Sequence, residues 1–158
     1  MKKAKGSPQP FGAVVRGNRV NFAVQVPQGK SCELLLYRAG RTSPEQCFEM
    51  PEEEGIGEVR FLAVEDIDAD KYEYNYRIGR KICVDPYVRE VAGKEHFGQK
   101  KDVQKHQVRG KLVSPEYDWE GDTRLHLPWN EVVAYSLHVR GFTKHTSSKA
   151  AHKGTFQG

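Results

Sequence analysis

The side chains best suited to chemistry in this sequence are aromatic. Tyr72, Tyr74 and Tyr76 recur at every second residue, so on a β-strand all three would share one face. Because pyranose rings pack against aromatic faces, this row suggests a carbohydrate-binding surface. The alternative is that the rings line a core with their hydroxyls at its edge. The regular alternation with the polar residues between them favours the core.

The sequence lacks the spacings of known metal-binding and nucleophile motifs. Its six histidines show no HExxH or comparable ligand spacing. The acidic stretch from Asp66 to Asp70 lacks the twelve-residue pattern and terminal glutamate of a calcium loop. A G-x-S-x-G elbow and a phosphate-binding glycine loop are also missing. We therefore expect neither a metal nor a cofactor.

Composition bounds the partners and the compartment. The 25 basic and 21 acidic residues of the 158-residue chain give a net charge of +4, and the lysines are scattered. A nucleic-acid binder concentrates its charge on one element, so we expect no nucleic-acid partner. Three unspaced cysteines indicate free thiols in a reducing cytoplasm. No apolar run reaches the roughly 18 residues of a membrane span, so no membrane partner is expected.

Hydrophobic alternation and turn residues divide the chain into short strands. Residues 1–10, rich in lysine, glycine and proline, are expected to be a disordered lead-in. The Gly17-Asn18 dipeptide predicts a tight hairpin. The pattern predicts no helix of ordinary length and an antiparallel β-sandwich over residues 11–113. The expected strands span residues 11–16, 19–26, 32–38, 46–50, 58–64, 71–78, 81–84 and, weakly, 107–113.

The last part of the chain has a different pattern. Residues 114–130 are expected to be a linker, and the run Val132–Val139 is apolar on both of its faces. Such runs are typical of parallel strands buried on both sides. Nothing after it could supply partner strands, so residues 131–158 are interpreted as the truncated start of a second domain. We expect residues 132–139 to be disordered, to fold back on the sandwich, or to self-associate with another molecule.

Several ordered motifs support a resemblance to a known family. Tyr135-Ser-Leu-His138-Val-Arg140-Gly-Phe-Thr, followed by Gly154-Thr-Phe-x-Gly158, resembles the first barrel strand and following loop of debranching enzymes. These are the pullulanases, isoamylases and glycogen-debranching enzymes of the alpha-amylase superfamily. The pieces Asp85-Pro-Tyr87-Val-Arg89, Asp118-Trp and Pro128-Trp agree with the family in the same order. The family has a glutamate where this chain has Ser136.

The resemblance implies an immunoglobulin-like sandwich, related to glycogen-binding modules, followed by the first strand of a (β/α)8 barrel. The parent enzyme would hydrolyse α-1,6 branch links in glycogen, pullulan or limit dextrins with paired carboxylates. Those carboxylates lie on later barrel strands, so no catalytic residue is expected in this chain.

The resemblance leaves the sandwich with two possible roles. It would bind α-glucan, or it would dock on the parent's own catalytic barrel; a purely structural sandwich without sugar binding is the alternative. Glucan-binding members present exposed tryptophans, and residues 11–113 contain none. Structural positions in the barrel or at the domain interface are expected for Asp85, Tyr87, Tyr135, His138 and Arg140.

Overall fold

The computed structural model describes residues 1–96, 98–114 and 118–158. The chain divides into two compact units, residues 1–117 and residues 118–158. Residues 115–117 of the expected linker lie outside the described part.

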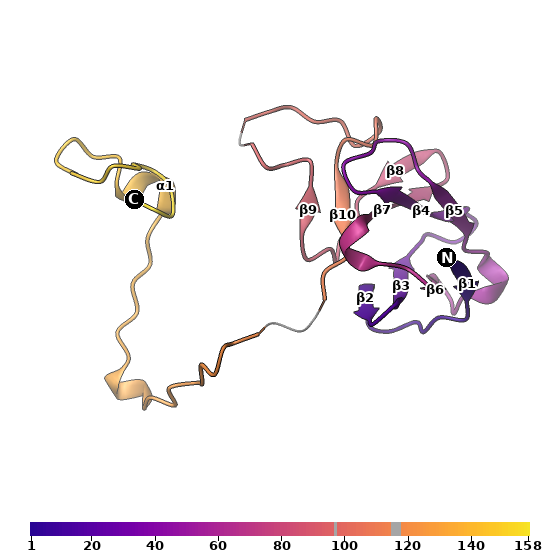
Figure 1. The fold of residues 1–158 in the computed structure, drawn as a ribbon, viewed down its shortest axis with the longest axis horizontal. Coiled ribbons are helices and arrows are strands. Elements are labelled where there is room, and N and C mark those ends of the chain that lie inside the picture. The colour runs from indigo at the N-terminus through magenta and orange to yellow at the C-terminus, as the bar shows by residue number, and fades with distance from the viewer. Residues whose placement is uncertain (97, 115–117) are drawn as a thin grey trace. The chain divides into compact units, whose positions relative to one another are not determined.

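The first unit is built from two antiparallel sheets, which form the two layers visible in Figure 1. The first sheet has the order β1-β6-β3-β2, and the second has the order β5-β4-β7-β10-β9, with β8 also paired to β7. This confirms the all-β, antiparallel sandwich. The strands are β1 (Lys2–Ala4), β2 (Gly12–Arg16), β3 (Arg19–Gln25), β4 (Cys32–Arg38), β5 (Gln46–Glu49), β6 (Val59–Glu65), β7 (Tyr72–Ile78), β8 (Lys81–Cys83), β9 (Val91–Ala92) and β10 (Arg109–Lys111).

Short helical turns complete the secondary structure. Within the described residues, three are single 3-10 turns and the fourth is one turn of α-helix. They span Glu52–Glu54, Ala69–Lys71, Trp129–Glu131 and, for α1, Val139–Phe142.

The core lies between the two sheets and is formed by every second residue of the strands. Alternate residues of β3, Val20, Phe22 and Val24, are buried against Leu34 and Leu36 of β4. Such a core contributes on the order of 25 cal/mol for each Å² of apolar surface removed from water. The predicted hairpin is confirmed, since β2 and β3 pair from Gly12↔Ala23 to Arg16↔Arg19 around the Gly17 turn.

The outer face of the second sheet is also covered. Leu35 and Tyr37, which point away from the main core, form a second apolar cluster with Ile82, against which Val103 packs. The segment before β10 adds polar contacts, because the Asn75 side-chain amide donates to the Val108 carbonyl at 2.9 Å. Strand β4 is therefore covered on both of its faces.

The amino-terminal residues are ordered, contrary to the expected disordered lead-in. Lys2–Ala4 pairs with Glu65–Ala63 of β6 and forms one edge of the first sheet. The lysine-rich composition concealed this strand, because its stability comes from the backbone ladder supplied by β6 rather than from its own side chains.

The second unit does not contain the expected barrel strand. Residues 132–138 have no regular secondary structure, and Val139–Phe142 forms the turn α1 instead. A strand needs a neighbour to satisfy its backbone N–H and C=O groups, and no described segment pairs with this one. Large apolar side chains therefore stay exposed, including Val133, Tyr135 and Phe142 at 76%, 88% and 68%.

Candidate functional site

The tyrosine row of β7 belongs to the core. Tyr72, Tyr74 and Tyr76 are 8%, 0% and 0% exposed and all three lie in the main apolar cluster. The Tyr72 hydroxyl donates to Glu45 Oε1 at 2.8 Å, at the edge of the core. This is the core alternative that the alternation favoured. A sugar has no ring face to stack on at these positions in this structure.

Asp85 anchors the Asp-Pro-Tyr motif from inside the sandwich. It is 2% exposed, and its two carboxylate oxygens accept from the Tyr74 hydroxyl at 2.9 Å and from the Tyr87 backbone N–H at 2.8 Å. Burial raises the pKa of the Asp85 carboxyl above its ordinary value, partly offset by these hydrogen bonds. Asp85 thus fixes the turn that carries Tyr87.

Tyr87 forms an aromatic platform on the surface. It is 54% exposed, and its ring stacks on Phe11 with a centroid separation of 5.0 Å and an interplanar angle of 18°. Gly12 makes this packing possible, because a Cβ at that position would lie 3.0 Å from Tyr87 Cβ, and its φ is +88°. Two anchors, the Asp85 turn and the Phe11 ring, therefore hold the Tyr87 ring in place.

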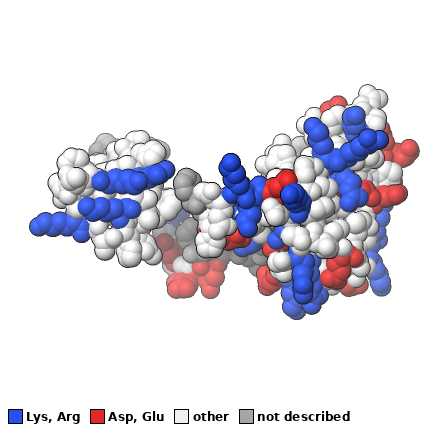
Figure 2. All heavy atoms as spheres, turned by 90° about the horizontal axis from the view of Figure 1, so that it is seen from above, with Lys and Arg blue, Asp and Glu red and all other residues white. Residues whose placement is uncertain are grey.

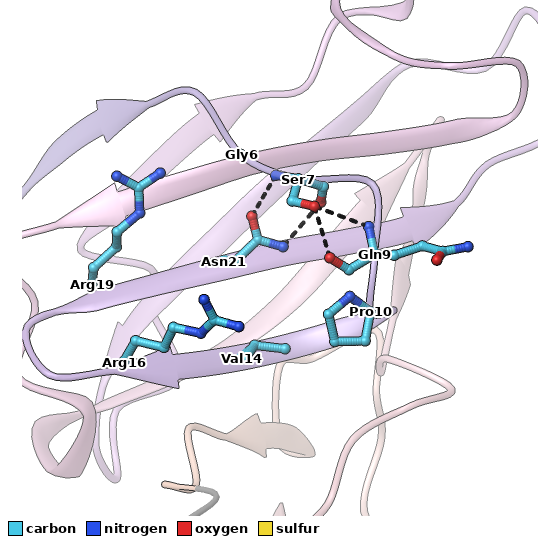
Figure 3. A pocket seen from close by; sticks show the side chains of 8 residues that line it. All are labelled: Gly6, Ser7, Gln9, Pro10, Val14, Arg16, Arg19 and Asn21. Carbon is cyan, nitrogen blue, oxygen red and sulfur yellow. Dashed lines mark hydrogen bonds between the residues drawn. The ribbon is translucent and has the colours of Figure 1, made fainter.

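A polar pocket lies on the outer face of the first sheet, beside Val14 (Figure 3). Its volume is about 210 Å³. Asn21 braces the wall formed by residues 6–10: its side chain accepts from the Ser7 N–H at 2.7 Å and donates to the Ser7 carbonyl at 3.0 Å. The lining residues are Gly6, Ser7, Gln9, Pro10, Val14, Arg16, Arg19 and Asn21.

Sequence reasoning missed this pocket. The signal was the pair Arg16 and Arg19 on either side of the predicted Gly17-Asn18 turn, which places two arginines opposite each other on one face. The wall could not be foreseen, since residues 6–10 were expected to be disordered.

The site residues expected near the barrel strand lie in the second unit. Tyr135 is exposed, and His138 caps α1, its Nδ1 accepting from the Gly141 N–H at 3.0 Å. Arg140 lies within the α1 turn, so it does not share a strand face with His138. Their roles in a barrel remain predictions.

The described part of the chain shows neither a metal site nor a membrane span, and its charges are mixed. Its described residues contain no group of three or more His, Cys, Asp or Glu side chains that could hold a metal ion. None of the helices in that part is long and apolar enough to cross a membrane. Figure 2 shows basic and acidic side chains interspersed over the visible face of the sandwich.

Curated relatives align with almost the whole chain. Isoamylase 1 of the chloroplast from Arabidopsis thaliana is 31% identical, with 97% of this chain and 22% of the relative covered. The GlgX homolog of the glycogen operon of Haemophilus influenzae is 30% identical, with 97% of this chain and 26% of the relative covered. The chain corresponds to the amino-terminal part of debranching enzymes.

Solved structures of debranching enzymes have the same fold. The pullulanase from Bacillus acidopullulyticus matches with a TM-score of 0.66 and 25% identity, over 92% of this chain and 17% of its own. The apo pullulanase from Paenibacillus barengoltzii gives a TM-score of 0.65 at 22% identity, over 94% of this chain and 22% of its own. No protein-family model matches. The chain spans about a quarter of the length of the curated debranching relatives it matches.

Proposed function

We propose that residues 1–114 are the amino-terminal domain of a glycoside hydrolase acting on α-1,6 branches of α-glucans, and that this domain serves by docking on the catalytic barrel. The relatives are named isoamylase, GlgX and pullulanase, and one pullulanase structure is a complex with maltotetraose. The free cysteines Cys32, Cys47 and Cys83 suit a reducing compartment such as the cytoplasm.

The observation that favours docking over glucan binding is the burial of the β7 tyrosines. An autonomous glucan-binding module needs exposed, coplanar aromatic rings. In the sandwich, Tyr72, Tyr74 and Tyr76 are committed to the core, and residues 11–113 contain no tryptophan.

Affinity electrophoresis tests this proposal. The 158-residue chain is run in gels containing glycogen, pullulan or amylopectin, beside a protein that binds no glucan. We expect no retardation in any gel. Retardation that a soluble maltooligosaccharide reverses would instead make the sandwich a glucan-binding module.

The docking role itself is tested in the full-length enzyme. Deleting the sandwich should lower the thermal unfolding temperature of the catalytic part, because it exposes the surface on which the sandwich docks. A catalytic part that keeps the same unfolding temperature and activity without the sandwich would refute docking.

A second function, glucan contact by the sandwich, is favoured only by the Tyr87 platform. Its ring is exposed and held rigid, as sugar-stacking rings are. If the gels do show retardation, Tyr87→Ala should abolish it. The control Tyr135→Ala removes an exposed tyrosine of the second unit and should leave it unchanged.

A further inference from the structure

Arg16 and Arg19 place two positive charges beside the pocket of Figure 3. They are directly paired across the β2–β3 hairpin, and their neighbours Val15 and Val20 point into the core, so both arginines face outward. Like charges directly opposite each other on one sheet face are destabilising. Glu65 supplies negative charge to Arg19, and on its other side Arg16 borders a second hollow whose lining includes Asp66, Asp68 and Asp70.

Of these two arginines, Arg19 is the one that is ion-paired among the described residues. Its Nη1 lies 2.7 Å from Glu65 Oε1, and its Nη2 donates to the Lys5 carbonyl at 2.6 Å. Arg16 makes no ion pair or hydrogen bond with any described residue of the chain. In Figure 3 the Arg16 side chain extends over the pocket between Asn21 and Val14.

Part of the lining is already committed to hydrogen bonds within the protein. The Asn21 amide is used by the backbone of Ser7, and the Ser7 hydroxyl donates to the Gln9 carbonyl at 2.8 Å. None of the eight lining residues is acidic. The five N–H donors of Arg16 are the strongest unused charged donors at the pocket, since no hydrogen bond to a described residue engages them.

We propose that this pocket binds a phosphate group, carried as inorganic phosphate or as a small phosphate monoester such as a sugar phosphate. A guanidinium presents paired donors that match two phosphate oxygens, and the charge strengthens each hydrogen bond. The volume of about 210 Å³ is well above the roughly 10–15 Å³ that a single water requires on the same measure. That leaves room for a phosphate and part of a small organic group over Val14 and Pro10. This site is independent of the docking role proposed above.

The test is an NMR titration of the full 158-residue chain with inorganic phosphate at constant ionic strength, about 0.1 M, to hold screening fixed. We expect saturable shifts of the amides of residues 6–10 and 14–21. Glucose 6-phosphate is the second ligand, and tighter binding of it than of phosphate would identify a monoester as the source. Maltose is the neutral control. Shifts that never saturate, or that maltose alone produces, would overturn the proposal.

Two substitutions separate specific binding from general electrostatics. Arg16→Gln should weaken phosphate binding by about ten- to a hundredfold, as expected for loss of charged hydrogen bonds. Arg41→Gln, which removes the same charge from an exposed loop residue, should leave it unchanged. Equal weakening by both would show that phosphate responds only to net charge.

A third variant guards against misfolding of the hairpin. Val14→Glu places a carboxylate on the pocket floor and should abolish phosphate binding, whereas the neutral Val14→Gln should retain it. The amides of β4 and β7 report whether the fold is intact. Undiminished binding by a folded Val14→Glu variant would overturn the proposal.

Discussion

Replacing Glu73 by alanine should cost the sandwich a large part of its stability. Glu73 Oε2 lies 2.5 Å from Arg109 Nε, and the two side chains are only 8% and 6% exposed. The pair joins β7 to β10 beneath the segment that precedes β10, and Arg109 also donates to the His106 carbonyl. Removing one partner of such a pair leaves an uncompensated charge where water has little access.

The magnitude follows from that burial. Breaking a buried ion pair from one side typically costs about 3–5 kcal/mol. At about 4 °C for each kcal/mol, the unfolding temperature of a domain near 100 residues would fall by about 12–20 °C. By contrast, exposed pairs such as Lys71–Asp68, with side chains 63% and 48% exposed, contribute about 0–1 kcal/mol.

Urea unfolding followed by far-ultraviolet circular dichroism measures the difference. Asp68→Ala serves as the matched control and should lower the unfolding free energy by less than about 1 kcal/mol. The double variant Glu73→Leu with Arg109→Met should recover most of the loss, because no unpaired charge is left. A loss for Glu73→Ala no greater than that for Asp68→Ala would refute the reasoning, since it would mean that water solvates Arg109 once its partner is gone.

Three further predictions address other parts of the chain. Because the pKa of Asp85 is raised in the folded state, the fold binds this proton more tightly than the unfolded chain does. The unfolding free energy of the natural protein, measured relative to Asp85→Asn, should therefore rise as the pH falls from 7 through the raised pKa; a pH-independent difference would contradict this. Gly93 and Gly98 share a positive φ, +88° and +86°, but only at Gly93 would a Cβ meet a backbone atom, the Gln107 oxygen at 1.9 Å. Gly93→Ala should thus cost about 1–3 kcal/mol more in urea unfolding than Gly98→Ala, and equal losses would argue against the clash. Deleting residues 131–158 should leave the unfolding midpoint of the sandwich unchanged, since they belong to the other compact unit; a collapse would show that the core needs them.

Local pattern was enough to predict the strands whose own residues carry the signal. The strand Cys32–Arg38 was predicted with its observed bounds, because turn residues lie on both sides of a continuous apolar run. The Gly17-Asn18 turn likewise fixed the register of the first hairpin. Glycine there adopts the positive φ of 58° that the turn requires.

The features that could not be predicted from the sequence depend on contacts with residues distant in the chain. Strand β1 exists only through its pairing with β6. In β6 itself Arg60, at 1% exposure, lies among core residues and is neutralised by Glu52 at 3.0 Å. An arginine at a core position is invisible to an apolar pattern. The pocket of Figure 3 was not predicted either, because residues 6–10, which form one of its walls, have a composition that suggested disorder.

The barrel strand illustrates the opposite case, in which a strong local pattern did not suffice. Val132–Val139 has the apolar character of a buried strand, yet no described segment supplies its ladder. The apolar pattern of a segment indicates which conformation it prefers when neighbouring strands are present. It does not indicate whether those strands are present.

The short strand β1 has a consequence for how this domain behaves at high concentration. Its residue Lys2 places a charge on the outer edge of the first sheet, where an incoming strand of another molecule would have to pair, and Lys3 next to it is held by Glu54 at 2.9 Å. Without β1, the backbone of β6 would become the new edge, and its Leu62-Ala63-Val64 run would stand at that edge without a lysine. Fragments that begin after Ala4 should therefore form insoluble aggregates more readily than the chain that keeps its first four residues.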